Sequence, residues 1–268
     1  GSATGETQVL SVAEDIRKKL DIQVDWYSDR QNAGESFRFL KRRMGNIHVL
    51  VMTSGIVGNN TRRKLNVEEF RAFTLVNKYA PLIFINSCDS DNGKLFSILH
   101  ELAHVWTGEN SFYNAPINAD SESREVEKFC NAVAAEILVP TESFLEKWKS
   151  SYDEILDKIG KIAKSFRCSR FVVVRKALDH GKISQETYEQ IVKELTSQFK
   201  EWQESQKENK GTGGDYYRNL ASKIDRNFVM ALARSASEGR TQYTEIYRLT
   251  NTNRKTFGRL LEEVGGAG

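Results

Sequence analysis

The amino-acid sequence predicts an α+β fold in which helices dominate, with a small, mainly antiparallel sheet and a helical module at the C-terminal end. Short segments rich in β-branched and aromatic residues occur before residue 87, and polar or Gly/Asn-containing stretches separate them, which is typical of strands. After residue 94 apolar residues instead recur at intervals of three and four, the spacing of a helix face. At 268 residues the chain is long enough to bury a core of moderate size and to carry an appendage.

The first part of the chain is expected to contain two helices and then the strands. Residues 1–24 are interpreted as a remnant of an expression vector, which the opening Gly-Ser resembles, followed by a helix and a linker. That helix is expected at Ser11–Leu20, where apolar residues recur at intervals of four, and a second one at Glu35–Met44. The expected strands are Ile47–Met52, Phe70–Val76 and Pro81–Asn86.

The apolar periodicity predicts helices over almost all of the second part of the chain. A polar run from Glu204 to Asp215 contains Lys-Gly-Thr-Gly-Gly and has no apolar periodicity, so it is the expected linker. Residues 216–268 then form the expected C-terminal helical module. The helices expected before the linker are Lys94–Thr107, Ser121–Val139, Thr141–Lys149, Tyr152–Phe166, Ser169–Leu178 and Ser184–Gln203.

Composition excludes several classes of protein. The formal net charge of +3 and the pI near 8.6 are only mildly basic, which argues against a dedicated nucleic-acid binder. The apolar runs fall far short of the roughly 20 residues that a membrane helix needs, so no membrane partner is expected. The three cysteines, Cys88, Cys130 and Cys168, lack close spacing and indicate a reducing compartment, so we expect a cytoplasmic protein.

The expected helix Lys94–Thr107 carries the clearest chemical signal. It is apolar over most of its circumference, but His100, Glu101 and His104 interrupt it with polar side chains. Two imidazoles at positions i and i+4 point the same way and can take two adjacent corners of a zinc tetrahedron. Glu101 is offset around the helix and can serve as a general base instead of a ligand. From the histidine and glutamate content of the 268 residues, roughly 0.005 copies of His-Glu-x-x-His are expected by chance. A metal site is therefore favoured over the alternative, in which the two histidines only pack in the core.

A catalytic zinc ion usually has three protein ligands, and the next helix offers several acids for the third position. By periodicity, Glu122 and Glu127 both border the apolar face of that helix, whereas Glu125 and Glu136 appear on its exposed side. Acids near a helix N-terminus are also common without any metal, because they interact with the helix dipole. The pattern alone leaves the third ligand open.

Two segments resemble a known family. The stretch LFSILHELAHVWTGE at 95–109, followed by EVEKFCNAVAAEILVP at 125–140, is similar to the ImmA/IrrE family of bacterial and phage metallo-endopeptidases. The second motif of that family reads roughly E-x-x-A-N-x-F-A-A-E-L-L-x-P, and Glu127, Asn131, Glu136 and Pro140 fall on it. Cys130 and Val133 depart from it, but both are apolar replacements within a packed helix.

The resemblance implies a specific site and activity. It makes residues 25–203 a zincin-like metallopeptidase domain with one zinc ion per chain, held by His100, His104 and Glu127, with Glu101 as the catalytic base. It further implies cleavage of a helix-turn-helix transcription repressor, hence regulated proteolysis in a phage, mobile-element or stress response. The alternative is a zinc-binding regulator with little or no turnover, which binds the repressor or DNA through its C-terminal module.

The C-terminal module itself could be a helix-turn-helix. Two amphipathic segments, Thr241–Thr250 and Arg254–Val264, flank the turn at residues 251–253. DNA binding is the less favoured interpretation here, because charge runs usually face water and the turn lacks its usual glycine. A solvated basic face on a helical appendage is therefore expected. The basic residues concerned are Arg240, Arg248, Arg254, Lys255 and Arg259.

Further residues near the motif have possible roles that the sequence does not rank. Tyr113, Arg175 and His180 could donate a hydrogen bond to an oxyanion. Ser169 is expected to cap a helix. Cys88 precedes the His-Glu-x-x-His helix and could approach the metal, although an isolated cysteine is more often only tolerated.

Overall fold

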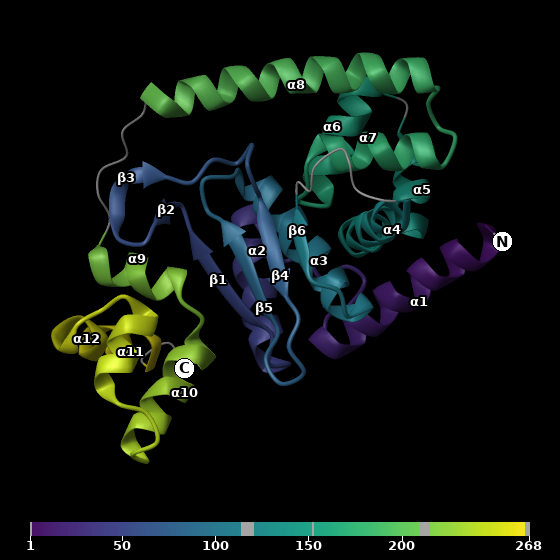
Figure 1. Ribbon diagram of the computed structural model, residues 1–268. Helices are drawn as coiled ribbons and strands as arrows, with labels where there is room; N and C mark the ends of the chain where they lie inside the picture. The colour runs from purple at the N-terminus through teal and green to yellow at the C-terminus, as the bar shows by residue number, and fades with distance from the viewer. Residues whose placement is uncertain (1, 114–120, 152, 209–214, 266–268) are drawn as a thin grey trace.

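The computed structural model describes residues 2–113, 121–151, 153–208 and 215–265 (Figure 1). A four-stranded sheet occupies the centre, α2 and α3 pack on one of its faces, and the remaining helices lie around this unit. The helix-dominated α+β class is confirmed. The helices are α1 (Ser2–Leu20), α2 (Ala33–Asn46), α3 (Asp91–Thr107), α4 (Ser121–Leu138), α5 (Thr141–Ser150), α6 (Ile155–Ser165), α7 (Arg170–Asp179), α8 (Gln185–Glu208), α9 (Tyr216–Lys223), α10 (Arg226–Ser237), α11 (Tyr243–Thr250) and α12 (Arg254–Gly265).

The sheet is mixed, with two antiparallel pairings and one parallel pairing. Its order is β1-β5-β4-β6; β1 runs parallel to β5, while β4 is antiparallel to both β5 and β6. The expectation of a mainly antiparallel sheet therefore holds, with the β1–β5 pair as its exception. A separate hairpin, β2–β3, follows β1. The strands are β1 (Leu50–Ser54), β2 (Ile56–Val57), β3 (Asn60–Lys64), β4 (Ala72–Leu75), β5 (Leu82–Asn86) and β6 (Ser111–Tyr113).

Two element boundaries differ from the prediction for identifiable reasons. The first strand begins at Leu50 and not at Ile47, because His48 adopts a left-handed conformation with φ 62° and turns the chain out of α2. Helix α8 continues to Glu208, so the first residues of the expected linker Glu204–Asp215 are helical. The rest of that linker, residues 209–214, lies outside the described residues.

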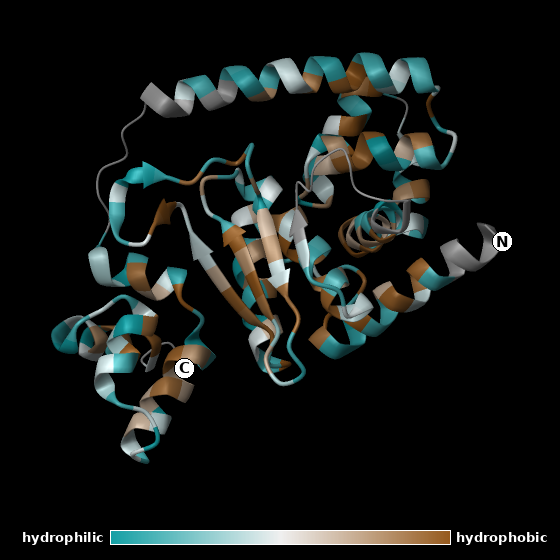
Figure 2. Ribbon diagram, viewed as in Figure 1, coloured by the Kyte–Doolittle hydropathy of each residue, from teal (hydrophilic) through white to brown (hydrophobic). Residues whose placement is uncertain are grey.

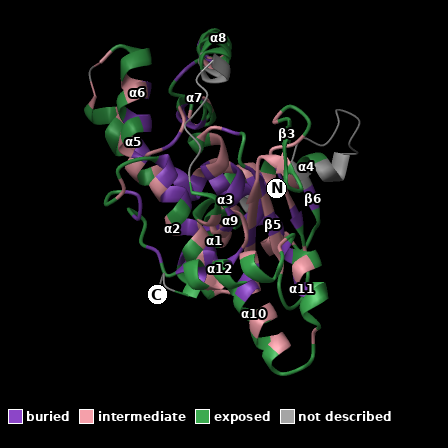
Figure 3. Ribbon diagram, turned by 90° about the vertical axis from the view of Figure 1, so that its left-hand side faces the viewer, coloured by how far each residue is buried: buried purple, intermediate pink, exposed green. Residues whose placement is uncertain are grey.

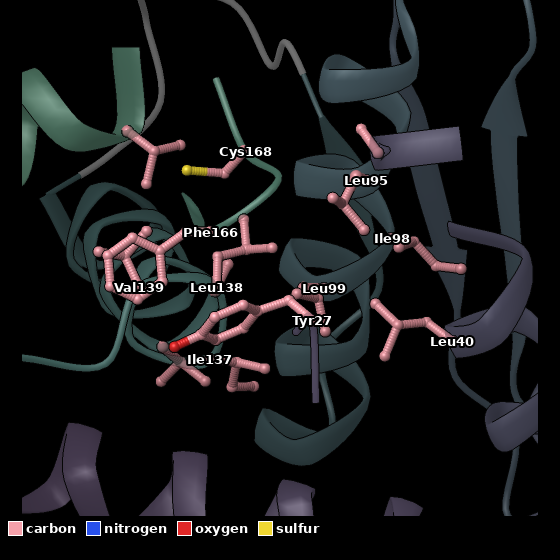
Figure 4. Close-up of a cluster of buried hydrophobic side chains, with 14 of the residues drawn as sticks. Tyr27, Leu40, Leu95, Ile98, Leu99, Ile137, Leu138, Val139, Phe166 and Cys168 are labelled. Carbon is pink, nitrogen blue, oxygen red and sulfur yellow. The ribbon is translucent and has the colours of Figure 1, made fainter. Parts of the chain in front are cut away.

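A single large hydrophobic core joins the sheet to the helices from α1 to α8. Figure 4 shows part of it, where Leu95, Ile98 and Leu99 of α3 face Tyr27, Leu40 and the end of α4. Helix α1 contributes Ala13, Ile16 and Leu20 to this core and packs on α4. In Figure 2 hydrophobic residues gather on the central strands, whereas β3 and much of α8 are hydrophilic.

The C-terminal helices α9 to α12 surround a hydrophobic cluster of their own and dock on the outer edge of β1. The Asp225 carboxylate accepts a hydrogen bond from the Val51 amide at 3.1 Å, and the Ser222 carbonyl accepts bonds from Lys41 Nζ and Thr53 Oγ1. Among the described helices none is both long enough and apolar enough to cross a bilayer. The buried members of the C-terminal cluster are Leu220, Val229, Ile246, Phe257, Leu260 and Val264.

Candidate metal centre

Both ends of α3 are fixed by local sequence. The Ser90 side chain accepts a hydrogen bond from the Gly93 amide and so caps the N-terminus. A Cβ atom at Gly93 would overlap the Asp89 carboxylate, so a larger residue there would displace this buried side chain. The helix ends at Gly108, whose φ of 80° lets the chain reverse and lead into β6. The three chemical residues of α3 are thus held in a rigid element that packs against the sheet.

Helix α3 buries both histidines and turns them toward the same point. His100 is fully buried and His104 nearly so. Their Nε2 atoms lie 3.2 Å apart, which follows from the one-turn spacing along the helix. Glu127 of α4 meets them there, with Oε2 3.2 Å from His100 Nε2 and Oε1 3.2 Å from His104 Nε2. The structure therefore brings together the three residues that the sequence and the family resemblance assign as ligands.

These three side chains fit a divalent metal by distance and by chemistry. A tetrahedral zinc ion with bonds of about 2.0–2.1 Å has ligand atoms about 3.3–3.4 Å apart. The separations among His100, His104 and Glu127 are close to this spacing, and their ligand atoms all lie within 4.8 Å of one another. Two imidazoles and one carboxylate are also a common ligand set of catalytic zinc sites, in which a fourth position stays open. The residues present therefore fit a catalytic metal ion.

The neighbouring imidazoles keep the Glu127 carboxylate ionised. Burial by itself raises the pKa of this carboxyl, but hydrogen bonds from His100 and His104 outweigh burial and lower the pKa to about 2. A metal ligand must be deprotonated, so this state suits binding. Glu127 is consequently charged over the whole physiological pH range.

The other acids of α4 have different surroundings. Glu125 is exposed, and the side chain of Glu122 lies outside the described residues. Glu136 was expected on the exposed side of the helix, and this prediction is wrong: the residue is 6% exposed. Lys176 Nζ donates to its Oε2 at 2.6 Å, and Arg17 donates to its backbone carbonyl. Periodicity could not reveal this burial, because the partners that neutralise Glu136 come from α1 and α7.

Glu101 lies beside the two histidines and is fully buried. Its Oε2 accepts hydrogen bonds from the hydroxyls of Thr74, at 2.6 Å, and Ser111. Its Oε1 has no hydrogen-bond partner among the described residues. Burial raises the pKa of the Glu101 carboxyl, although the nearby histidines and the two hydroxyls lower it in part. The carboxylate is thus fixed through one oxygen while the other is unengaged.

Thr74 and Ser111 belong to the candidate site through their hydrogen bonds to Glu101, and the sequence did not point to them. They belong to β4 and β6, two neighbouring strands that reach Glu101 only after the chain folds. A polar Thr74 within the apolar run Ala-Phe-Thr-Leu-Val was the available signal, since a threonine buried in a strand requires a partner. Ser111 offered no comparable signal.

The remaining residues considered from the sequence have structural partners. Ser169 caps α7 by accepting a hydrogen bond from the Val172 amide, as expected. Arg175 pairs with Asp179 on the same helix, and the His180 ring packs near Phe144. Cys88 Sγ lies 3.2 Å from the Gly55 carbonyl and is not part of the metal-binding group. The side chain of Tyr113 lies outside the described residues.

Comparison with known protein families agrees with this geometry. Residues 48–178 match the IrrE N-terminal-like domain (Peptidase_M78), a segment that contains all the strands, α3 and α4 and therefore every residue of the metal centre. Residues 224–263 match a domain of unknown function (DUF8813). A search of curated proteins gave no match. Residues 48–178 thus form a metallopeptidase-like domain that is similar to the IrrE N-terminal domain, in agreement with the resemblance of the sequence to the ImmA/IrrE family.

Proposed function

We propose that this protein is a zinc-dependent endopeptidase in which His100, His104 and Glu127 bind the metal. The observation that carries this proposal is the convergence of these three side chains next to a fourth, buried acid, Glu101. Three protein ligands leave one coordination position for water, which is the arrangement of catalytic zinc sites and not of structural ones. Imidazole nitrogens with a single carboxylate also favour zinc over the oxygen-binding cations calcium and magnesium.

The chemistry divides between the metal and Glu101. A zinc ion bound here supplies a Lewis acid that polarises the scissile carbonyl and makes a water molecule more acidic. Glu101 accepts a proton from the attacking water through its unengaged Oε1 and later delivers a proton to the leaving nitrogen. The hydroxyls of Thr74 and Ser111 hold the other carboxylate oxygen, so Glu101 meets the substrate in one orientation.

The role of Glu101 is tested by the substitution Glu101→Gln. The variant is expected to bind one equivalent of zinc, measured by elemental analysis, and to lose cleavage of a fluorogenic peptide library. Glu109→Gln, at an exposed position shortly after α3, is the matched control and is expected to keep both properties. Full peptidase activity of Glu101→Gln would show that another group acts as the base.

The assignment of Glu127, on α4, as the third ligand is tested separately. Glu127→Gln is expected to lower zinc affinity by at least roughly tenfold, because it removes the anionic ligand of the site. Glu125→Gln changes the same residue type two positions away at an exposed site and is expected to leave zinc affinity unchanged. The measurement is competition against a chromophoric chelator. Equal zinc affinity of the two variants would remove Glu127 from the ligand set.

The proposed substrate is a helix-turn-helix transcription repressor, and the support for this step is the match of residues 48–178 to the IrrE N-terminal-like domain together with the resemblance to the ImmA/IrrE family. The test is incubation of the zinc-loaded protein with the repressor encoded next to its gene, followed by mass spectrometry of the products. Cleavage by the wild type and not by Glu101→Gln is the expected result. Release of the repressor from DNA that is equally strong with both proteins, without cleavage, would favour the alternative function of a regulator that only sequesters the repressor.

We also propose a cytoplasmic location. All three cysteines are free thiols, with Cys130 and Cys168 buried and Cys88 exposed, and unpaired cysteines suit a reducing compartment. Fractionation of cells that express the native gene should recover the protein with cytoplasmic markers. Recovery with an oxidised Cys88 in an extracytoplasmic fraction would contradict this assignment.

A further inference from the structure

The β2–β3 hairpin contacts the C-terminal module through Asn59. Asn59, in the hairpin turn, donates a hydrogen bond from Nδ2 to the Asn251 carbonyl at 3.1 Å. At the adjacent Gly58 a Cβ atom would lie 3.7 Å from Asn251 Nδ2. Asn251 belongs to the turn between α11 and α12. Segments separated by 192 positions in the sequence therefore contact each other, and Figure 3 views the molecule from the side on which the hairpin and the C-terminal helices lie.

The hairpin and α12 both carry several exposed cations. Strand β3 is exposed over its whole length, and its sequence Asn-Thr-Arg-Arg-Lys places three cations there. Helix α12 adds three more on its exposed face, and residues 216–268 contain nine Lys and Arg against five Asp and Glu. Within the described part of the chain, only Arg259 among these six makes an ion pair, with Glu262. We call this set the basic surface; its members are Arg62, Arg63, Lys64, Arg254, Lys255 and Arg259.

The exposed face of α12 also contains a glycine that packing within the chain does not require. Gly258 lies between Lys255 and Arg259 on this face, and a Cβ atom there would meet nothing within 4 Å. A glycine inside a helix costs about 0.5–1 kcal/mol relative to alanine. Its benefit is that another molecule can approach the helix backbone closely. Gly258 therefore leaves the backbone of α12 accessible to another molecule.

A three-residue turn at 251–253 joins α11 to α12, which is the connection length of a helix-turn-helix. Asn251 adopts the left-handed conformation, with φ 53°, and so takes the place of the glycine whose absence from the sequence argued against this motif. The Asn253 side chain then accepts a hydrogen bond from the Thr256 amide and caps α12. Phe257, Leu260 and Val264 point into the module, which leaves the opposite face of α12 for a partner.

We propose that the basic surface binds double-stranded DNA, with α12 in the major groove and the β2–β3 hairpin on the adjacent phosphate backbone. At 12 residues α12 is about 18 Å long, and the major groove, about 12 Å wide, admits such a helix. The hairpin and the α11–α12 turn meet at Asn59 and Asn251. With α12 in the groove, cations on α12 and on the hairpin can therefore contact phosphates on either side of the groove. An acidic protein is the alternative partner for a basic surface. Binding such a protein would require neither the helix-turn-helix arrangement nor the exposed Gly258, so duplex DNA explains more of the observations.

The test compares two charge-removing variants of the full chain. Arg62→Ala/Lys64→Ala alters the hairpin, and Arg254→Ala/Lys255→Ala alters α12. Lys149→Ala/Lys164→Ala is the matched control, since it removes two exposed cations on α5 and α6, across the molecule from the basic surface. Binding to a fluorescent 30-base-pair duplex of mixed sequence is measured by anisotropy over a range of salt concentrations.

Each of the two test variants is expected to weaken duplex binding at least roughly tenfold at 0.1 M salt. Each should also reduce the slope of log K against log salt by about 2, because two phosphate contacts are lost. The control variant should bind like the wild type. Unchanged binding by either test variant would overturn the two-element surface, and tighter binding of single-stranded RNA or polyglutamate than of duplex DNA would overturn the assignment to DNA.

Discussion

The two carboxylate oxygens of Glu101 have different surroundings, and this difference leaves one of them available for the proposed proton transfer. Oε2 accepts hydrogen bonds from Thr74 and Ser111, whereas Oε1 has no partner among the described residues. The two hydroxyls come from separate strands of a sheet that packs against α3. The position of the proposed base is thus determined by the sheet as well as by its own helix.

At this residue scale, removal of the two hydroxyls should affect turnover more than metal binding. The double variant Thr74→Val/Ser111→Ala is expected to lower kcat roughly tenfold to hundredfold while zinc content and KM stay near the wild-type values. Steady-state kinetics and elemental analysis provide the measurement. Thr74→Ser, which keeps the hydroxyl, is the control and should retain most of the activity. A rise in KM with unchanged kcat would instead assign these residues to substrate binding.

The sequence predicted which residues converge at the candidate metal centre better than it predicted the contacts that support them. His100 and His104 share one helix, so their spacing alone places them together. Glu127 needed the family motif, because periodicity left Glu122 equally possible. Thr74 and Ser111 could not be assigned, since their contacts depend on how β4 and β6 pair across the sheet.

At the scale of elements, the two halves of α4 make different contacts. Glu127, in its first half, faces the histidines, while Glu136, near its C-terminus, forms a buried network with Arg17 of α1 and Lys176 of α7. Thr141 also donates to Glu136, through both its amide and its hydroxyl. The network fixes α4 between two other helices and therefore orients the helix that carries the third ligand.

Breaking this network should destabilise the fold without removing the metal ligands. Lys176→Met leaves Glu136 buried without its main cation and is expected to lower the free energy of unfolding by about 3 kcal/mol. Urea denaturation of the zinc-loaded protein measures the effect. Lys182→Met, at an exposed position after α7, is the control and should change the stability by less than about 0.5 kcal/mol. Similar stabilities of the two variants would show that the network contributes little.

Elements with a hydrophobic period were predictable, and those without one were not. All helices from α2 to α8 were expected within a few residues, because each has an apolar face toward the core. The β2–β3 hairpin was missed because β3 is entirely polar and exposed, so it lacks the alternation that predicts a strand. Strand β6 has only three residues and forms through its partner β4. The parallel β1–β5 pairing depends on long-range packing that no local pattern encodes.

At the scale of the whole molecule, one aspartate joins the C-terminal module to the sheet. Asp225 caps α10 through Oδ1, which accepts from the Asn227 and Phe228 amides, and it accepts from the Val51 amide of β1 through Oδ2. The residue is buried at this junction. A helix cap and an interdomain contact are thus made by the same carboxylate.

Removal of this carboxylate should loosen the junction. Asp225→Ala is expected to lower the free energy of unfolding by about 2 kcal/mol and to accelerate hydrogen exchange of the Val51 amide. Asp215→Ala is the matched control, because Asp215 caps α9 in the same way but is exposed, and it should leave Val51 exchange unchanged. Exchange at Val51 that is equally slow in both variants would contradict the contact.

Lys41 gives the same junction a pH dependence. Burial lowers the pKa of Lys41 from 10.5 to about 8, although Asp225 partly offsets this shift. The unfolded chain therefore binds more protons between pH 8 and 10.5, and stability rises with pH in that range. The stability of the wild type relative to Lys41→Met is expected to increase by about 2 kcal/mol from pH 8 to pH 10, measured by urea denaturation. A difference that stays constant with pH would contradict the shift, and Lys18→Met, at an exposed site, is the control.

The docking of Asp225 on β1 has a consequence for self-association. Strand β1 is the last strand of its sheet, with the sequence Leu-Val-Met-Thr-Ser, and the C-terminal helices cover its outer side. An uncovered strand of this kind is a template for pairing with a second chain. A shortened protein that ends after α8 should consequently aggregate through β1, so the C-terminal helices are expected to protect this strand from pairing with a second chain.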